Sequence, residues 1–374
     1  MRIDAGVCRK AILFLAVSFS VLLAACSGGT TLRPIPSPSP PEPTPAPRPV
    51  SMPADEAGHD DRLEWWYYSG HLTALSGEEF GFSFVIFQSL DPGGNPVYSS
   101  QFGLTNVAGQ THSVTSRLFA GDASKSDAGV FGLQLGDWSL DIEPDSHVIR
   151  GVISEDSGFY LLLKRDPAVP PVLQAGIGWF PTPTGWSYYY SFPDMEASGR
   201  LLMDGKTYEV TGTAWFDHQW GDFFAIGAPS GWQWFALHLG DGQTMMVTET
   251  RDAEGNRQAV FGSLSNRLGE TRTITEADGI SIEVLDTWNS PNTGAEYPSR
   301  WRVVVESLEL DVEVVPVLAD QEVTVGIPRA AIYWEGKVTV DGVFGASSIQ
   351  QPGYVELTGY VSPEPLPWRA TTGQ

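Results

Sequence analysis

The sequence predicts an all-β protein made of two antiparallel β-barrel domains in tandem. Three observations support this fold class. Short apolar runs alternate with turns rich in Gly, Pro and Asp, no segment from residue 26 onward indicates a helix of three turns, and an aromatic motif occurs twice. The 374 residues include 40 glycines and 28 prolines, and 11% of them are aromatic. Such large rings and turn formers favour β structure.

Several segments carry clear strand signals. The run 80–87 is apolar and aromatic, and a cluster of Asp, Pro, Gly and Asn over 91–96 follows it as a turn. Residues 199–208 contain two strand arms around an Asp-Gly pair, the signature of a hairpin. Residues 308–314 alternate apolar and acidic side chains, which predicts a strand with one face in water.

The aromatic motif indicates an internal duplication. Residues 65–72 align with residues 232–239, so that Trp65 corresponds to Trp232, and both copies end in His-Leu. A period this long indicates duplicated domains, although a chance likeness between two aromatic strands would give the same match. Closing each copy into a barrel removes exposed sheet edges. We therefore expect barrels over 54–222 and 223–374, with a shared structural role for His71 and His238.

The N-terminus has the pattern of an export signal. Three basic residues precede an apolar run over 11–25, and Leu-Ala-Ala-Cys closes it at Cys26. This ending resembles the bacterial lipobox, in which the cysteine is lipidated and becomes the new N-terminus. An uncleaved anchor or an ordinary signal peptide is the alternative interpretation. Ser27 after the cysteine favours the outer membrane in a Gram-negative host. No later run is long and apolar enough to cross a bilayer.

Residues 26–53 form a proline-rich linker that is too poor in apolar residues to fold. We interpret it as a stalk, and a proline motif that binds a partner domain is the alternative. With a formal net charge of -23, the chain repels phosphate backbones, so nucleic acid is not an expected partner. The predicted location is the cell envelope, lipid-anchored and facing outside the cytoplasm.

Three motifs resemble one known family. They are 64–72, 212–221 and 333–336 with 353–360. In order and spacing they resemble the AttH-like proteins, a family that includes the bacterial carotenoid 1,2-hydratases. The resemblance implies a pair of lipocalin-like barrels. In the hydratases, an aspartate that corresponds to Asp217 protonates a terminal carbon–carbon double bond. Here Trp215 stands in place of their Tyr and Phe216 in place of their His, which removes a phenol and an imidazole from the expected pocket.

The residues around Asp217 are chemically consistent with that role. In a strand over 208–217, Trp215 and Asp217 share one face and His218 points to the other. A carboxyl beside an indole is desolvated, which raises its pKa and keeps it neutral, as alkene protonation requires. The indole face could also stabilise a carbocation. We select Asp217, His218 and Trp215 as catalytic candidates. A turn over 217–221 capped by the aspartate is the alternative.

The ligand-binding candidates are aromatic or acidic. In the first strand, Glu64, Trp66 and Tyr68 share one face, while Trp65, Tyr67 and His71 share the other. One face should line a cavity and the other should pack, but the period does not distinguish them. Glu64 is either an inward-facing acid or part of an ion pair at the rim. The predicted set comprises Glu64, Trp66, Tyr68, Tyr190 and Trp220, although packing in the core is the favoured interpretation of Trp220.

Other chemistries have no anchor in the sequence. There is no Gly-x-Ser-x-Gly elbow and no phosphate-binding loop, and both cysteines lie in the first 30 residues. Asp217, His218 and Asp222 are a weak metal set, so we expect neither metal nor cofactor. The favoured function is binding of an apolar small molecule, a lipid or isoprenoid, with a transporter as a candidate partner. A hydratase-like lyase that uses Asp217 is the alternative, and export away from carotenoid synthesis weakens it.

Overall fold

The computed structural model describes residues 46–362, apart from 92, 128–129, 183–184, 224–230, 253 and the side chain of 330. The described residues form one compact unit. The predicted signal peptide and most of the predicted linker lie outside the described residues and remain predictions. Within the described part, no helix has the length and hydropathy needed to span a bilayer.

The first sheet contains all strands up to residue 222 and is ordered β4-β3-β2-β1-β13-β12-β9-β8-β7-β6-β5, with β10 and β11 also paired to β12. Its strands are β1 (Leu63–Ala74), β2 (Glu79–Leu90), β3 (Pro96–Asn106), β4 (Thr111–Ala120), β5 (Ser124–Asp127), β6 (Val130–Leu135), β7 (Trp138–Glu143), β8 (Ser146–Ser154), β9 (Ser157–Lys164), β10 (Val172–Leu173), β11 (Trp179–Thr182), β12 (Gly185–Met203) and β13 (Lys206–Asp222).

The second sheet is ordered β17-β16-β15-β14-β23-β22-β20-β19-β18, with β21 paired to β22. Its strands are β14 (Gly231–Gly240), β15 (Gln243–Arg251), β16 (Arg257–Asn266), β17 (Thr271–Ile274), β18 (Ile280–Asn289), β19 (Glu296–Val305), β20 (Leu310–Pro316), β21 (Glu322–Val323), β22 (Tyr333–Phe344) and β23 (Ser347–Leu357). The described helices are 3-10 turns of three residues: η1 (Ala54–Glu56), η2 (Gln174–Gly176), η3 (Glu276–Asp278), η4 (Glu306–Leu308) and η5 (Arg329–Ala331).

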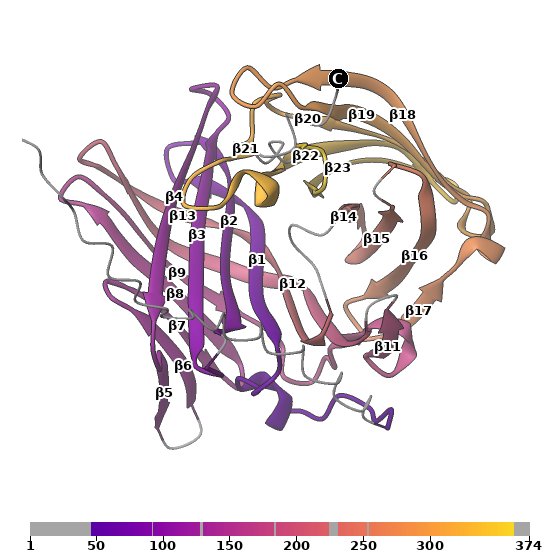
Figure 1. Ribbon diagram of the computed structural model, residues 1–374. Coiled ribbons are helices and arrows are strands. Elements are labelled where there is room, and N and C mark those ends of the chain that lie inside the picture. The colour runs from indigo at the N-terminus through magenta and orange to yellow at the C-terminus, as the bar shows by residue number, and fades with distance from the viewer. Residues whose placement is uncertain are drawn as a thin grey trace, which may run out of the picture. The chain divides into compact units, whose positions relative to one another are not determined.

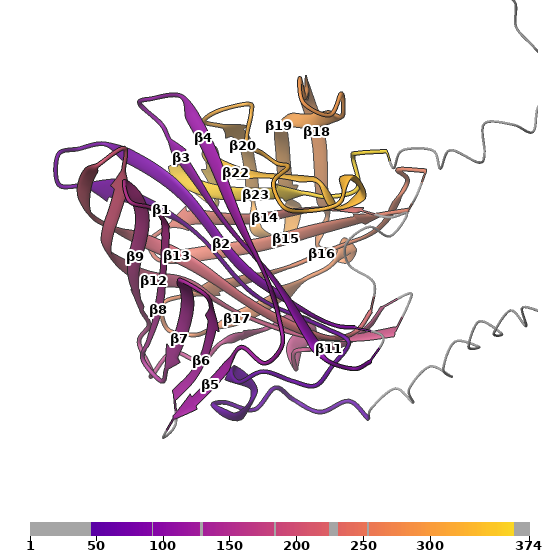
Figure 2. The same ribbon diagram turned by 60° about the vertical axis from the view of Figure 1, so that its left-hand side comes forward.

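Both sheets are antiparallel and curl into half-barrels that lie side by side (Figures 1 and 2). This arrangement confirms the predicted class of tandem lipocalin-like barrels. The pairing order of each sheet runs from one edge strand to another, β4 to β5 and β17 to β18, and the described residues give no hydrogen-bonded closure between those edges. The change of sheet falls between Asp222 and Gly231, while the predicted domain boundaries remain predictions.

The local strand predictions are confirmed, with one difference. The run 80–87 lies in β2, and the Asp204-Gly205 pair forms the turn between β12 and β13. In β20, Leu310, Val312 and Val314 are buried while the acidic residues between them are half-buried. The strand begins at Leu310 rather than at 308, because η4 ends at Leu308 and Glu309 adopts a positive φ of 51°.

The two copies of the aromatic motif occupy equivalent places. Strand β1 pairs with β2 and with β13, and β14 pairs with β15 and with β23. In both sheets, therefore, the motif strand lies between the next strand and the last long strand. Strand β1 is buried on both faces through most of its length, which is why its sequence does not alternate between apolar and polar residues.

Three apolar clusters follow from this arrangement. One fills the curl of the first sheet and a second fills the curl of the second sheet. The third, which we call the inter-sheet cluster, lies where the two sheets meet and contains Tyr67, Val85, Tyr189, Trp215, Trp234, Ala236, Met246 and Tyr354. Both faces of β1 and β13 are therefore covered by protein. One is covered by the cluster in the curl of the first sheet, which we call the first core, and the other by the inter-sheet cluster.

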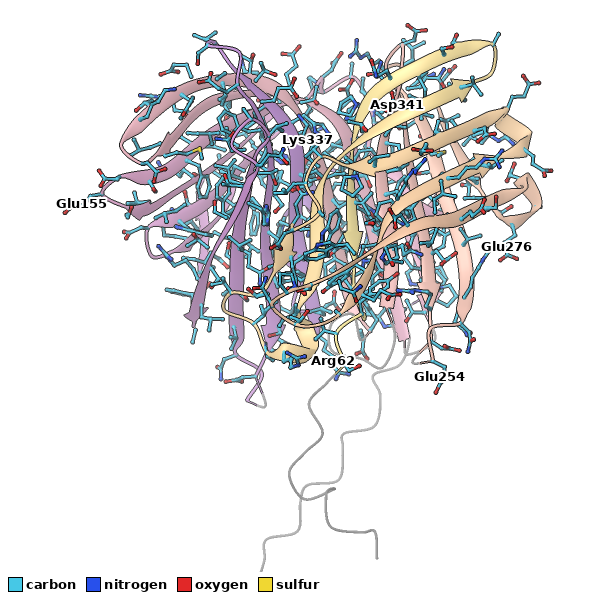
Figure 3. The ribbon with its side chains drawn as sticks, turned by 90° about the horizontal axis from the view of Figure 1, so that it is seen from above. Arg62, Glu155, Glu254, Glu276, Lys337 and Asp341 are labelled. Carbon is cyan, nitrogen blue, oxygen red and sulfur yellow. The ribbon has the colours of Figure 1, made fainter. Side chains whose placement is uncertain are left out.

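Polar contacts also join the two sheets. Lys337 of β22 lies at the junction, while Glu155, Glu254 and Glu276 project from the margins (Figure 3). The Nζ atom of Lys337 is 3.1 Å from Oε2 of Glu79 in β2. A Cβ atom on Gly81 would be only 2.7 Å from the Lys337 Cβ atom, so the sheets approach closely at this point.

We predict that Gly70→Ala lowers the free energy of unfolding by about 1–3 kcal/mol, as overpacking does elsewhere. An added Cβ atom would overlap the carbonyl oxygen of Thr213 in the paired strand β13 and the ring of Phe82. Urea unfolding of the full chain, followed by tryptophan fluorescence, measures the loss. Thr73→Ala is the control because Thr73 is exposed on the same strand, and it should shift stability by less than about 0.5 kcal/mol. Equal stabilities for the two variants would contradict the prediction.

Candidate functional site

The pairing of β1 with β13 divides the predicted site residues between two faces. In this register Tyr67 lies opposite Asp217, Trp66 opposite His218, and Glu64 opposite Trp220. Successive side chains of a strand point to opposite faces. Asp217 therefore faces the second sheet and His218 faces the first core, as the sequence predicted for these two neighbours. The predicted site residues therefore lie in two separate environments, one between the sheets and one inside the first sheet.

Asp217 is held inside the inter-sheet cluster and is only 3% exposed. The hydroxyl of Tyr189 donates to Oδ2 at 2.7 Å, and the indole N–H of Trp215 donates to Oδ1 at 2.8 Å. Trp234 of the second sheet donates in turn to the Tyr189 hydroxyl at 3.1 Å. Because β13 continues to Asp222, the alternative of a turn capped by Asp217 is wrong.

Two further carboxyls enter this region from the second sheet. Glu335 accepts hydrogen bonds from the Ser83 hydroxyl at 2.7 Å and the Tyr67 hydroxyl at 3.0 Å, both from the first sheet. Glu356 accepts the indole N–H of Trp232 at 3.1 Å and lies beside Glu335 in the pairing of β22 with β23. The polar network thus spans both sheets.

These three carboxyls share an unusual electrostatic state. Burial raises the pKa of Asp217 to about 6, that of Glu335 to about 7 and that of Glu356 to about 8, with the charge of Glu335 adding to the effect at Glu356. Their hydrogen-bond donors among the described residues are hydroxyl and indole groups, which favour the ionised form less than a cation does. The carboxyls of this region therefore titrate close to neutral pH.

The margin of the inter-sheet cluster is aromatic and partly exposed. The half-buried rings that pack against the cluster are Trp65, Phe87, Phe180, Trp232 and Phe261. Phe180 of the first sheet faces Phe261 of the second with 6.2 Å between ring centroids. Glu356 is also half-buried, so it is the carboxyl of the three that reaches solvent. An apolar molecule that approached Asp217 from this margin would meet rings first.

The predicted ligand-binding residues all lie on the other face. Glu64, Trp66, Tyr68, Tyr190 and Trp220 are buried inside the curl of the first sheet. His218 lies among them, stacked on Trp66 at 5.0 Å between centroids. The rings are in mutual contact and pack as a core. As ligand-binding residues they remain a prediction.

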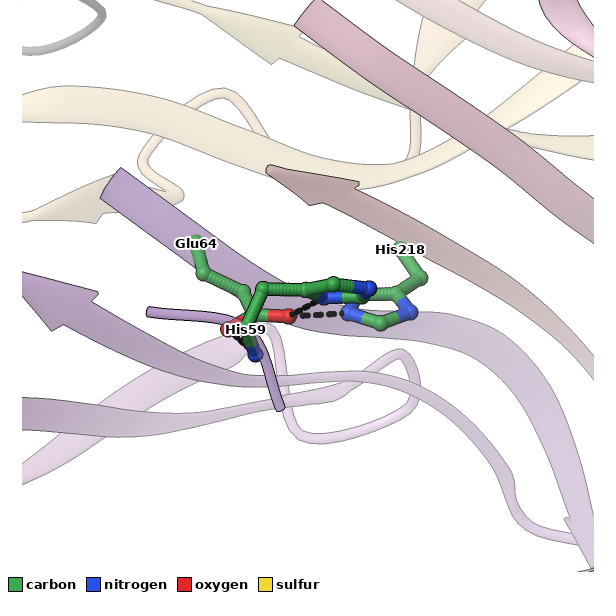
Figure 4. A group of neighbouring side chains, drawn as sticks. All are labelled: His59, Glu64 and His218. Atoms are coloured by element: carbon green, nitrogen blue, oxygen red, sulfur yellow. Dashed lines mark hydrogen bonds and ion pairs between the residues drawn. The ribbon is translucent and has the colours of Figure 1, made fainter. Parts of the chain in front are cut away.

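A hydrogen-bonded group of three side chains, the barrel triad of His59, Glu64 and His218, lies within this core (Figure 4). Oε1 of Glu64 is 2.7 Å from Nδ1 of His59 and 2.7 Å from Nε2 of His218. Burial acts to raise the pKa of Glu64, but the hydrogen bonds from the two imidazoles outweigh it and hold that pKa below its usual value. Glu64 is therefore an inward-facing carboxylate and not a rim acid.

His71 and His238, the matching histidines of the duplication, contact each other across the sheets with 5.8 Å between ring centroids. An open cavity of about 320 Å³ lies beside His238. Its lining is polar and includes none of the predicted catalytic or ligand-binding residues: Asp194, His238, Gly240, Asp241, Gly242, Gln243, Arg267 and Gln351.

Sequence reasoning missed four residues of these sites: His59, Tyr189, Glu335 and Glu356. Glu356 takes the place in the second copy that Asp217 takes in the first, but only the strand pairing shows it. Tyr67 corresponds to Trp234, and Tyr67 pairs with Asp217 just as Trp234 pairs with Glu356. His59 precedes the first strand and carries no periodic signal. It joins Glu64 and His218 only through the fold.

We predict that Glu335→Gln flattens the pH dependence of stability. Glu335 is 1% exposed, and its pKa is about 7 when folded against an ordinary 4.5. Between these pH values the unfolded chain has lost the proton that the folded chain retains. The free energy of unfolding therefore falls as pH rises, by up to about 1.4 kcal/mol per pH unit. Glutamine has the same shape but does not titrate. The free energy of unfolding of the variant, relative to that of the wild type, should therefore rise from pH 5 to 7.

The measurement is urea unfolding at several pH values, with exposed Glu296→Gln as the control that follows the wild-type curve. Parallel curves for Glu335→Gln and the wild type would show that Glu335 is already ionised in the folded protein.

Comparison with known proteins places these features in a family. The AttH-like family model matches residues 43–360. A putative AttH from Nitrosomonas europaea is 28% identical, with a TM-score of 0.74 over 85% of this chain and 99% of that chain. Kievitone hydratase from Nectria haematococca is 19% identical, with a TM-score of 0.65 over 84% of this chain and 94% of that chain.

CghA, solved with Sch210972, is 12% identical, with a TM-score of 0.57 over 86% of this chain and 95% of that chain. The likeness to kievitone hydratase and to CghA is one of fold. A search of curated proteins finds no match. The family match extends over both sheets and all three motifs, and the chain belongs to the AttH-like family.

Proposed function

We propose that this protein binds an apolar, unsaturated small molecule between its two sheets and adds water to it, with Asp217 as the proton donor. The observation that carries the proposal is the setting of the Asp217 carboxyl. It is buried among rings contributed by both sheets, and each of its oxygens accepts a hydrogen bond from an uncharged donor. Such a setting suits an acid that must transfer a proton to carbon away from bulk water.

The chemistry balances as a simple hydration. The Asp217 carboxyl gives its proton to one alkene carbon, and the π electron pair of the double bond forms the new C–H bond. The other carbon becomes cationic and is captured by water, whose extra proton returns to a carboxylate. Asp217, which has just given up its proton, accepts it and is restored for the next reaction. The product is an alcohol.

The aromatic rings support the cationic stage of this reaction. Trp215 and Trp234 meet edge to face with 5.9 Å between centroids, and Tyr67 meets Trp234 at 5.6 Å. An electron-rich ring face stabilises a nearby cation, more strongly in a desolvated site. A protein with the same fold, kievitone hydratase, bears the name of a hydratase, which agrees with the proposed reaction class.

We also propose that the protein acts outside the cytoplasm, anchored by a lipid on Cys26. The support is the sequence alone, an apolar run that ends in Leu-Ala-Ala-Cys, followed by a proline-rich segment. In that location an apolar substrate would come from a membrane or from a transporter in the same envelope. Carriage of the ligand without turnover is the second candidate, since the aromatic margin would serve binding equally.

We expect Asp217→Asn to lower turnover by about 10²–10⁴-fold while the ligand stays bound, because the amide keeps the shape but has no acidic proton. The full chain is purified in mild detergent and extracted with organic solvent, and the retained compound is identified by mass spectrometry. That compound, and a panel of acyclic isoprenoids with terminal double bonds, is then incubated in isotopically heavy water.

Wild type should give products heavier by one labelled water, and Asp141→Asn, which removes a carboxyl from β7, should match it. Retention of a ligand that neither protein alters would favour carriage. If Asp217→Asn hydrates the compound at the wild-type rate, Asp217 is not the acid. If no apolar compound binds, both candidate functions fail.

We expect Cys26→Ser to release the protein from the membrane fraction, because the thiol that accepts the lipid is gone. Cys8→Ser is the matched control, since it removes the other cysteine of the chain and should leave the protein membrane-bound. Fractionation and intact-mass measurement distinguish the two. Membrane association of Cys26→Ser equal to that of wild type would contradict lipid anchoring.

A further inference from the structure

The barrel triad brings together three potential metal ligands from two distant parts of the chain. His59 precedes β1, Glu64 belongs to β1 and His218 belongs to β13 (Figure 4). One donor atom from each of the three residues lies within 4.8 Å of the others. Nδ1 of His59 and Nε2 of His218 are the nitrogens that contact Glu64. The hydratase chemistry proposed above makes no use of the triad, which lies on the opposite face of β13.

The donor set matches one class of metal. Two imidazole nitrogens with one carboxylate oxygen suit Zn²⁺ and related first-row transition ions, whereas Mg²⁺ and Ca²⁺ prefer oxygen ligands throughout. Bonds of about 2.0–2.2 Å to a shared ion place donor atoms roughly 3–4 Å apart. The nitrogen–oxygen distances here are 2.7 Å, so small side-chain rotations would open the group around an ion.

Each donor is also oriented by a second partner, which is the usual arrangement around protein-bound metals. Nε2 of His59 is 3.5 Å from Oδ1 of Asp55, and Nδ1 of His218 is 3.2 Å from the Tyr190 hydroxyl. These contacts leave Nδ1 of His59 and Nε2 of His218 directed at Glu64. Arg48 fixes Asp55 in turn, through two hydrogen bonds of 2.6 and 2.9 Å.

The carboxylate is oriented in the same way. Oε2 of Glu64 accepts the backbone N–H of His59 at 2.8 Å and the amide of Gln88 at 3.4 Å, while Oε1 faces the imidazoles. The rings of Trp220 and Trp66 stack on His59 and His218 respectively. Glu64 and His218 are fully buried, and His59 is 17% exposed in its side chain, so an ion would arrive past His59.

We propose that His59, Glu64 and His218 form a binding site for one divalent transition-metal ion of the zinc class. The ion replaces the two N–H···O hydrogen bonds of the triad with three metal–ligand bonds, and the displaced protons leave to solvent. Three protein ligands leave a coordination position for water or a substrate atom. The alternative, a triad that serves only as a hydrogen-bonded brace between the segment before β1 and the sheet, is an outcome of the test below.

The test uses the full chain in mild detergent, purified without a polyhistidine tag and stripped with a chelator. Equilibrium dialysis against Zn²⁺ followed by elemental analysis should give one ion per chain. Co²⁺ should give a visible absorption band, whose intensity reports the coordination geometry. Asp55→Asn, which removes the charge that faces His59 and Arg48 but no metal ligand, should weaken binding by about 10–100-fold. His218→Gln and Glu64→Gln should abolish the stoichiometric binding and the band.

His147→Gln is the matched control. His147 is a buried histidine of the same core, hydrogen-bonded to the Tyr68 hydroxyl at 2.8 Å and outside the triad, so its variant should bind the ion normally. Near-ultraviolet circular dichroism checks that each variant is folded. Because His59 precedes the sheet, His59→Gln gives a loss-of-ligand variant whose sheet pairing is untouched.

Two results would overturn the proposal. One is a folded wild type that binds neither ion at stoichiometric levels, which leaves the triad as a hydrogen-bonded brace. The other is binding that persists unchanged in His59→Gln, His218→Gln and Glu64→Gln, which would assign the ion to the acidic surface of this chain of net charge -23. Neither result bears on the hydration assay, because Asp217 faces the second sheet.

Discussion

The structure depends on the register of one strand pair, β1 with β13. Both strands are covered on both faces, by the first core on one side and by the inter-sheet cluster on the other. A shift by one residue would exchange the two sets of side chains. It would move Asp217 in among Trp66 and Tyr68 and would turn His218 toward the second sheet. The chemical identity of both sites therefore rests on main-chain pairing that places Tyr67 opposite Asp217.

Buried carboxyls behave in opposite ways on the two faces of this pair. On the inter-sheet face, Asp217 and Glu335 have uncharged donors, and desolvation prevails, so their pKa values rise. On the inner face, Glu64 is held by two imidazoles, and its pKa falls despite equal burial. The pKa values shift in opposite directions because the hydrogen-bond partners differ, and not because one carboxyl is more deeply buried. The first sheet thus separates two kinds of buried carboxyl. On one face they have raised pKa values, and on the other Glu64 is ionised and hydrogen-bonded to two imidazoles.

Much of the fold could be predicted from the sequence, because turns and strand alternation are local. The Asp204-Gly205 hairpin and the alternation of buried and more exposed residues in β20 were predicted in this way. The division of Asp217 and His218 between two faces also followed from alternation. The period could not show which face of β1 meets the first core, since both faces are buried. Nor could it show that Glu335, far along the chain, accepts a hydrogen bond from Tyr67. Contacts of that kind exist only after the sheets meet.

The two copies of the aromatic motif contact each other through residues at matching positions. Tyr67 contacts Trp234, which holds the same place in the second copy, and His71 contacts His238 in the same way. Contact between a residue and its own counterpart is the property of an isologous interface, the kind formed by a symmetric pair of subunits. At these two contacts the single chain therefore has the geometry of a symmetric pair. A single polypeptide allows the two halves of such a pair to differ, and the acids at equivalent places are Asp217 in one half and Glu356 in the other.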